Sequence, residues 1–126
     1  MIIFLSNKYE DRSYANGMDG LLNNPNNEYR HVTEREKEDL RSKGEKAWKN
    51  YLKEIIKNCD VLTCLIGKDT HNAQGVIYEL EVATSLGIKI IPVRIPNTTS
   101  PSPQIIRNKN IIPWNAKEIN NAISLD

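Results

Sequence analysis

The sequence predicts a doubly wound α/β fold, with a five-stranded parallel sheet in a single domain spanning residues 1–126. Two largely apolar runs, residues 61–66 and 88–95, lie on either side of an amphipathic segment. That is the pattern of a strand, a crossover helix and a parallel strand. A third apolar run, at residues 1–5, precedes further helix and strand candidates, and 126 residues suit one compact domain.

The first predicted strand, residues 1–5, is wholly apolar and therefore suits the centre of a parallel sheet. Ser6 and Asn7 come directly after it, at the carboxyl end, where open α/β sheets bind ligands. Residues 8–27 contain two glycines and an asparagine-rich stretch, so we expect a short helix followed by a flexible loop.

The second predicted strand, residues 29–33, is less apolar and suits the edge of the sheet. The mixed-charge stretch after it, residues 33–46, indicates a solvated loop or helix face. Within it, residues 42–45 have the spacing of a capping box. That box should open an amphipathic helix ending near Asn58, with Trp48 in the core or in a pocket wall.

Residues 61–66 and 88–95 are the third and fourth predicted strands, and the helix between them covers residues 72–86. Asp69, Thr70 or Asn72 can cap the start of this helix, and Gly87 suits its end. Residues 96–103 are irregular, residues 110–113 are a fifth short strand, and a capping box at 115–118 opens the last helix. This element order indicates a fold of the flavodoxin-like type.

Glu79 is in an unusual position on the predicted 72–86 helix. At about 100° per residue, the apolar residues Val76, Leu80 and Ala83 form one face, and Glu79 falls inside that face. Glu81 falls outside it. An ionised carboxylate on a core-facing position is costly unless it is paired or opens into a cleft. Glu79 is therefore a partnered structural acid or part of an active-site pocket.

Composition excludes several classes of function. The formal net charge of +1 gives no basic excess for binding nucleic acid. No apolar run has membrane length, and Cys59 and Cys64 suit buried thiols in a reducing compartment, so a cytosolic protein is expected. The sequence lacks a phosphate-binding GxxxxGK[ST] loop and a GxGxxG fingerprint. His31 and His71 have no partner at metal-ligand spacing, so no metal site is predicted.

Three groups of polar residues should converge at the carboxyl edge of the sheet. Ser6, Asn7 and the Tyr-Glu-Asp run at 9–11 follow the first strand, residues 67–72 follow the third, and Tyr78 and Glu79 open the next helix. A lone glutamate among neutral hydrogen-bonding groups suits sugar chemistry. It can bind ribose hydroxyls and stabilise an oxocarbenium-like transition state.

The order of these motifs resembles the bacterial TIR-like domain family, which includes the TIR-like proteins of Thoeris anti-phage defence. The resemblance rests on FLSNKYED near the start, on VLTCLIGKDTHNAQGVIYELEVATSLGIKIIPVRI, and on a late Trp-Asn before the last helix. It covers nearly the whole chain. The family often has a tryptophan about four residues before its glutamate. Here residues 74–76 stand in that place, so either Tyr78 supplies the ring or the role is vacant.

The resemblance implies an enzyme that cleaves NAD at the nicotinamide–ribose bond, with NAD as substrate and no separate cofactor. Glu79 takes the position of the catalytic glutamate. Ser6, Asn7 and Tyr9, with Asp11 as a further contact, take the position of the nucleotide-binding loop. The product would be an ADP-ribose-derived messenger that reaches a separate effector, and such enzymes can need self-association. Two alternatives stay open: a non-catalytic nucleotide-binding or protein-interaction module, and a nucleoside deoxyribosyltransferase-like enzyme.

Overall fold

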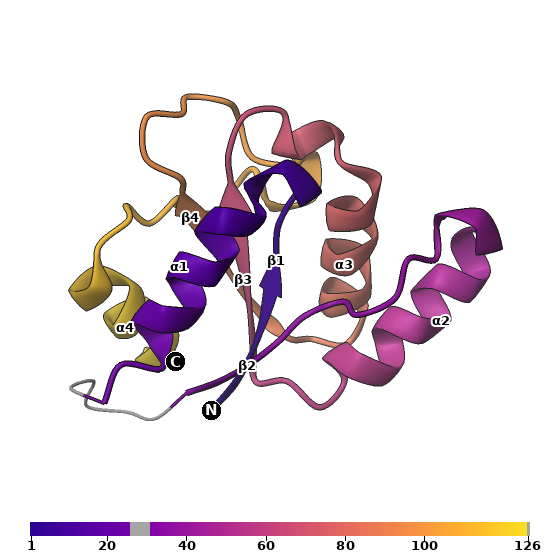
Figure 1. Cartoon of the computed structure of the whole chain (residues 1–126), viewed down its shortest axis with the longest axis horizontal. Helices are drawn as coiled ribbons and strands as arrows, with labels where there is room; N and C mark the ends of the chain where they lie inside the picture. Colours follow the sequence, from indigo (N-terminus) through magenta and orange to yellow (C-terminus); the bar gives the residue numbers. More distant parts are fainter. Residues whose placement is uncertain (26–30, 126) are drawn as a thin grey trace.

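The fold is a parallel sheet covered by helices on both faces (Figure 1). It is seen in a computed structural model that describes residues 1–25 and 31–125. The strands are β1 (Ile2–Ser6), β2 (Val32–Glu34), β3 (Val61–Ile66) and β4 (Lys89–Arg94). The α-helices are α1 (Arg12–Leu22), α2 (Glu45–Ile56), α3 (Gln74–Ser85) and α4 (Ala116–Ser124). The 3₁₀ turns are η1 (Tyr9–Asp11), η2 (Arg41–Lys43), η3 (Thr70–Asn72) and η4 (Gln104–Ile106).

The strand order is β2-β1-β3-β4, and all three neighbouring pairs are parallel. These are the first four positions of the flavodoxin-like order. The chain leaves β1 toward β2 on one side and later returns to β3 on the other. The carboxyl ends of β1 and β3 therefore form the switch point of the sheet, where Ser6 stands beside Cys64.

The predicted fifth strand is wrong for the described part of the chain, which has four strands. Residues 110–113 make a single bridge in which the Ile112 amide donates to the Pro92 carbonyl and the Arg94 amide donates to the Ile112 carbonyl, both at 2.8 Å. Pro113 follows immediately, and because it has no amide hydrogen the pairing cannot continue through it.

The edge strand is shorter than predicted and ends one residue later. The structure has β2 at Val32–Glu34, whereas residues 29 and 30 of the predicted strand lie outside the described residues. Helix α1 is longer than expected at 11 residues, although it contains Gly17 and Gly20. Both glycines lie on its exposed side, and the buried residues Ala15, Met18 and Leu22 hold the opposite side to the sheet.

Alternate residues of the strands divide the core into two apolar clusters. Phe4, Leu62 and Cys64 pack with α2 and α3 on one face of the sheet. Ile3 and Leu65 pack with α1 and α4 on the other. This alternation follows from the two-residue period of a strand, and both faces of a parallel sheet must be covered.

Two predicted helix caps are wrong. The turn η3 absorbs Thr70 and Asn72, so α3 begins after Ala73 without a side-chain cap. Helix α2 begins after Gly44, whose φ of 86° only glycine adopts freely, and the predicted capping box at 42–45 does not form.

Two other predicted helix ends are confirmed. The Asn115 side chain accepts a hydrogen bond of 3.0 Å from the Glu118 amide at the start of α4. Gly87 has a φ of 70°, as expected for the residue that follows a helix.

Cys59 and Cys64 are buried free thiols. In the described residues no helix combines the length and the hydrophobicity that crossing a membrane requires.

Candidate functional site around Glu79

Glu79 is buried at the switch point of the sheet. Its side chain is 4% exposed, and its Oε1 accepts a hydrogen bond of 2.7 Å from the Ser6 hydroxyl at the carboxyl end of β1. Val76, Leu80 and Ala83 are buried on the same side of α3, which confirms the predicted core-facing position of this acid. The structure therefore brings together Ser6 and Glu79, which are 73 positions apart in the sequence.

The electrostatics of this corner favour the neutral form of the carboxyl group. Burial raises the pKa of Glu79 well above its ordinary value, and only the hydrogen bond from Ser6 acts in the opposite direction. Burial and the neighbouring Glu79 also raise the pKa of the Cys64 thiol, which stays protonated. No lysine or arginine in residues 1–25 and 31–125 forms a salt bridge with Glu79.

Glu81, two residues further along α3, differs from Glu79 because it has a cationic partner. Its carboxylate pairs with Lys49 of α2 at 2.5 Å, and Lys49 also pairs with Glu45 at 2.9 Å. Both acids raise the pKa of Lys49. Glu81 is therefore an ordinary paired acid between two helices at the surface, as its position on the helix predicted.

An aromatic wall stands beside α3 and comes from two helices. The Trp48 and Tyr78 rings meet edge to face, with centroids 5.2 Å apart. A Cβ atom at Gly75 would lie 3.0 Å from Cζ2 of Trp48, so the missing side chain at residue 75 leaves room for the indole. The half-buried Trp48 of α2 therefore packs beside Gly75, four residues before Glu79.

Glu36 is a second acid of the site that the sequence did not reveal. It lies half-buried in the segment between β2 and η2, residues 35–40, close enough to Glu79 for its charge to raise the pKa of that acid. Burial raises the pKa of Glu36, and the contacts with Glu79 and Trp48 oppose this rise. The mixed-charge stretch has no helix or strand periodicity, so no pattern could single out the one acid that turns inward.

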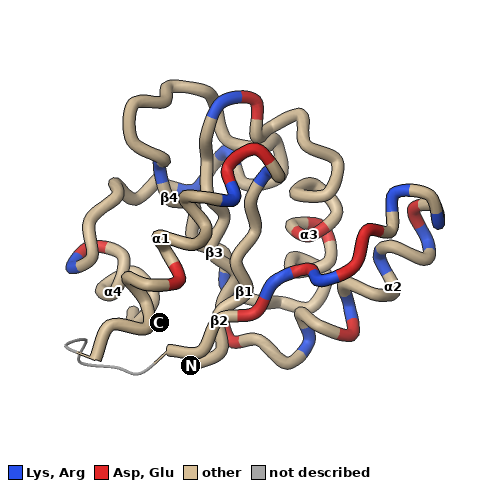
Figure 2. The backbone as a smooth tube through the Cα atoms, viewed as in Figure 1, with Lys and Arg blue, Asp and Glu red and all other residues tan. Residues whose placement is uncertain are grey.

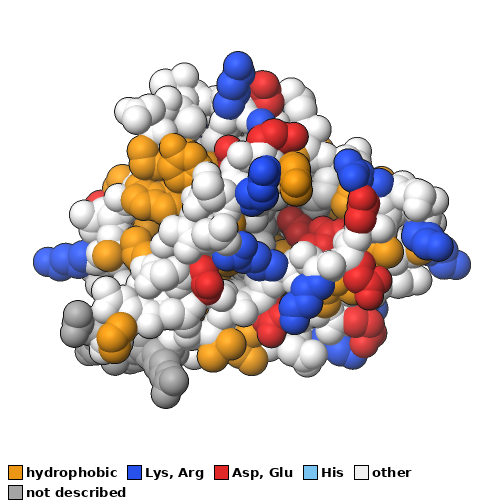
Figure 3. Space-filling view, viewed as in Figure 1, with side chains coloured by type: hydrophobic (Ala, Val, Ile, Leu, Met, Phe, Trp, Pro, Cys, Tyr) orange, Lys and Arg blue, Asp and Glu red, His pale blue; other side chains and the backbone are white. Residues whose placement is uncertain are grey.

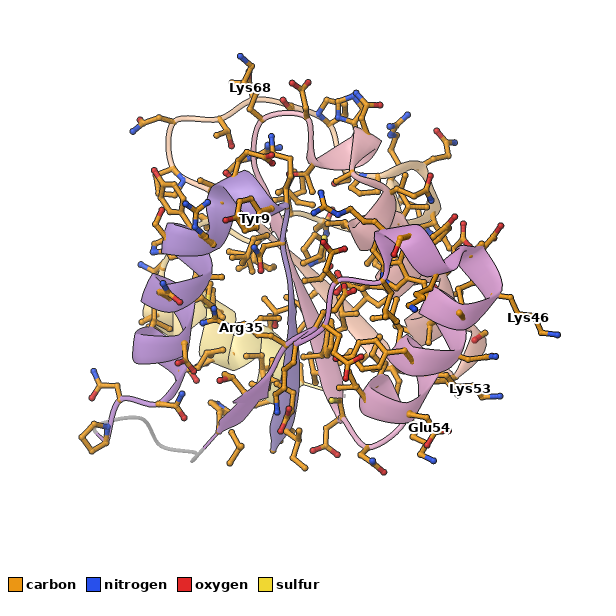
Figure 4. The ribbon with its side chains drawn as sticks, turned by 45° about the vertical axis from the view of Figure 1, so that its right-hand side comes forward. Tyr9, Arg35, Lys46, Lys53, Glu54 and Lys68 are labelled. Carbon is orange, nitrogen blue, oxygen red and sulfur yellow. The ribbon has the colours of Figure 1, made fainter. Side chains whose placement is uncertain are left out.

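The loop after β1 lies beside Glu79 and does not bond to it. The Asn7 amide donates to the Lys8 carbonyl at 2.8 Å. Tyr9 is 72% exposed beside the end of β1 (Figure 4), with the Arg12 guanidinium 4.4 Å from its ring centroid. Of the residues predicted in this part of the site, Ser6 therefore contacts Glu79, whereas the contacts of Asn7 and Tyr9 are with Lys8 and Arg12.

Asp11 packs against the loop after β3. A Cβ atom on Gly67 would lie 2.6 Å from Asp11 Oδ2, so only a glycine fits there without a shift. This Oδ2 is buried and has no hydrogen-bond partner among the described residues. Burial raises the pKa of Asp11, and Lys8 opposes the rise. The Lys8 ammonium group also donates to the Lys68 carbonyl, which joins the loops after β1 and β3.

The surface above these residues is hollowed. Figure 3 shows acidic atoms recessed in a hollow between β1 and α3, with lysine and arginine side chains around it. Within the described residues no group of three or more histidine, cysteine, aspartate or glutamate side chains could hold a metal ion. The polar groups that meet at Glu79 are its own carboxyl group and the Ser6 hydroxyl, which are group types that hydrogen-bond the hydroxyls of a sugar.

Fold and site together define the class of protein: a doubly wound α/β domain with a buried glutamate at its switch point. The family model described as Thoeris protein ThsB, TIR-like domain, matches residues 4–100 of this chain. The chain therefore belongs to the Thoeris ThsB family of TIR-like domains. No curated protein matches the sequence significantly. The matched range includes the carboxyl end of β1 with Ser6, the whole of α3, and both Glu36 and Glu79.

Proposed function

We propose that this TIR-like defence protein is an NAD-cleaving enzyme, a glycohydrolase or cyclase, in which Glu79 is the catalytic residue. The observation that supports this most is the Glu79–Ser6 hydrogen bond, in which a buried carboxyl group without a cationic partner lies where doubly wound sheets bind ligands. A buried acid of this kind costs stability, so a purely structural role gives it little reason to be there.

The reaction needs one bond to break and one to form. The bond between ribose C1′ and the nicotinamide nitrogen breaks, and nicotinamide leaves as a neutral molecule with the electron pair. Positive charge develops on the ribosyl group, and the Glu79 carboxylate stabilises it while binding the ribose hydroxyls. Water, or an atom of the same ADP-ribose, then attacks C1′ and releases a proton. The product is a diffusible ADP-ribose derivative that would activate a separate effector.

The surrounding groups support these roles. The Ser6 hydroxyl fixes the orientation of the Glu79 carboxyl group. The Trp48 and Tyr78 rings, which meet edge to face beside α3, are the candidate surface against which a nicotinamide or adenine ring would stack. Asn7, Tyr9 and Asp11 follow the same strand end and are the candidate contacts for the rest of the nucleotide.

The test is nicotinamide release from NAD, followed by chromatography, for the wild-type protein and for Glu79→Gln. We expect the variant to lose release by about 100-fold or more, the loss typical of removing a transition-state charge partner. Glu81→Gln is the matched control, because it makes the same change two residues away, at a surface acid paired with Lys49, and should keep full activity. Equal release by Glu79→Gln and the wild type would overturn the proposal.

Two other outcomes identify the alternatives. Retained NAD binding in calorimetry without release would favour a non-catalytic nucleotide-binding module. Transfer of a deoxyribosyl group between bases would favour a deoxyribosyltransferase-like enzyme. The observation that favours this alternative is that Glu36 raises the pKa of Glu79, since sugar-transfer sites commonly contain two carboxyl groups.

A further inference from the structure

A cavity lies at the carboxyl end of β4, and β3 separates that strand from Ser6 on β1. The cavity has a volume of about 470 Å³. It is lined by an arginine, two prolines, an isoleucine and a tryptophan: Arg94, Pro96, Ile111, Pro113 and Trp114. Figure 3 shows hydrophobic side chains gathered on the surface over β4 and α1. This β4 cavity is within the size range of small-molecule binding sites.

Trp114 forms the aromatic part of the wall and is held there by α1. The Tyr14 ring meets its indole edge to face, with centroids 5.8 Å apart. A Cβ atom at Gly17 would lie 3.8 Å from Cζ2 of Trp114, an ordinary van der Waals distance, so α1 packs directly against the indole. The ring is nevertheless only half-buried. The late Trp-Asn pair of the sequence therefore has two roles: Asn115 caps α4, and Trp114 lines the cavity.

The loops that carry the other wall residues are fixed by hydrogen bonds. The Thr98 hydroxyl donates to the Ile95 carbonyl at 2.7 Å and closes the turn after β4. The Ile112 amide donates to a carbonyl of β4 at 2.8 Å and ties residues 111–113 to that strand. The two proline rings restrict the backbone further. The cavity is therefore preformed, so a ligand would not have to order its walls.

Arg94 is the charged residue among those that line the cavity. Its Nη1 donates to the Ser100 carbonyl at 2.7 Å, which fixes the direction of the guanidinium group. In the part of the chain that the structure describes, no acid forms a salt bridge with it. Residues 82–117 contain five lysines and arginines and no aspartate or glutamate, and Figure 2 shows this stretch in blue and tan. The local charge is therefore positive.

We propose that the β4 cavity binds a small molecule that joins an aromatic ring to an anionic group, a phosphate or a carboxylate. The ring lies against the Trp114 indole and the proline rings, and the anion accepts hydrogen bonds from the Arg94 guanidinium, whose planar donors match two anionic oxygens. A purely apolar partner would cover the walls and leave this cation without an anion. The site goes beyond the function proposed for Glu79 and does not depend on it.

The first experiment follows the indole N–H signal of Trp114 by proton–nitrogen NMR during titration with naphthyl phosphate, an aromatic anion. The signal is assigned by its loss in Trp114→Phe. We expect a saturable shift of the Trp114 signal. Naphthol, which has the ring alone, and inorganic phosphate, which has the anion alone, should bind at least about 10-fold more weakly. No saturable shift with naphthyl phosphate, or equally tight binding of naphthol, would overturn the proposal.

The second experiment removes the charge from the cavity. Arg94→Gln should weaken binding of naphthyl phosphate by about 10-fold or more, because a charge-assisted hydrogen bond is lost, and should leave naphthol binding unchanged. Arg94→Met fills similar space without the charge, so it should show the same loss and serves if Arg94→Gln does not fold. Arg107→Gln is the matched control, the same change at an exposed arginine that does not line the cavity. Wild-type affinity in the folded Arg94 variants would contradict the proposal.

The Trp48 indole signal reports in each variant whether the protein stays folded, since Trp48 packs on the opposite face of the sheet from Trp114. Glu79→Gln should leave the Trp114 titration unchanged, and its loss there would assign the ligand to the Glu79 site and refute a separate one. Without a probe, the Trp114 signal should not depend on protein concentration. A concentration-dependent shift, with a dimer in analytical ultracentrifugation that Arg94→Gln removes, would assign the cavity to an interface between copies and overturn the proposal.

Discussion

The two faces of the sheet are built from alternate residues of the same strands, yet they differ in one respect. The face under α1 and α4 is filled by apolar side chains such as Ile3, Leu5 and Leu65. The face under α2 and α3 is equally apolar for most of its length, but at the carboxyl edge it places Ser6 and Glu79 where further hydrocarbon would fit. The face under α1 and α4 is therefore an apolar scaffold. The face under α2 and α3 contains a buried polar pair, Ser6 and Glu79, which we call the polar corner and which lowers stability.

The largest expected effect belongs to the scaffold face. Leu65→Ala removes a fully buried side chain packed under α1 and α4, and should lower the free energy of unfolding by about 2–5 kcal/mol in urea denaturation. Leu65→Met, which conserves volume, should cost less than about 1.5 kcal/mol. Nicotinamide release per folded molecule should be unchanged in both. A loss of release greater than the loss of folded protein would show that the two faces are not separable.

The polar corner should appear in the pH dependence of stability. The pKa of Glu79 is raised in the folded protein, so below the ordinary glutamate value of about 4.3 the acid is protonated in both states and adds no pH dependence. Above that pH the unfolded chain loses the proton while the folded protein keeps it. Stability therefore falls as pH rises, by up to about 1.4 kcal/mol per pH unit for one proton, until the folded group ionises.

Glu79→Gln should flatten this fall, and Glu81→Gln should leave it in place because Glu81 is a surface acid with a salt bridge. Urea denaturation at a series of pH values measures the slope. The same slope in Glu79→Gln and in the wild type would mean that Glu79 is ionised in the folded protein and that the polar corner is better solvated than its burial indicates.

The smallest expected effect on the free energy of unfolding is that of the α4 cap, on the scaffold face. Asn115→Ala removes the side-chain cap of α4 and should lower the free energy of unfolding by about 1 kcal/mol, measured by thermal or urea denaturation. Asn121→Ala, an exposed position in the same helix, should change it by less than about 0.5 kcal/mol. Neither variant should change nicotinamide release. A change in release with Asn115→Ala would extend the functional region to the α4 face.

The scaffold and the catalytic candidate could be predicted for the same reason: both depend on periodic patterns. Apolar runs predicted β1, β3 and β4, and the helical period predicted that Glu79 faces the core. The fifth strand was wrong because a four-residue segment that ends in Pro113 can form only a single bridge. The caps of α2 and α3 were wrong because the predicted capping residues lie in, or at the start of, the 3₁₀ turns η2 and η3 that precede these helices.

Glu36 and Trp48 show what periodicity cannot supply. Glu36 lies in a stretch where every second or third residue is charged, and its inward direction is set by distant contacts of Arg35 and Lys37 with α1 and α2. Trp48 reaches the site because Gly75, on another helix, leaves space for its ring. Both positions depend on contacts between elements, which a single sequence does not reveal.

The most direct test of the central claim, that the polar corner exists for chemistry and not for stability, is the double variant Ser6→Ala/Glu79→Met. It replaces both hydrogen-bonded partners by apolar groups, so no buried polar atom loses its partner in that bond. We predict a free energy of unfolding equal to that of the wild type or higher by about 1 kcal/mol, with nicotinamide release lost. A loss of about 2 kcal/mol or more of stability, or release that persists, would contradict the account.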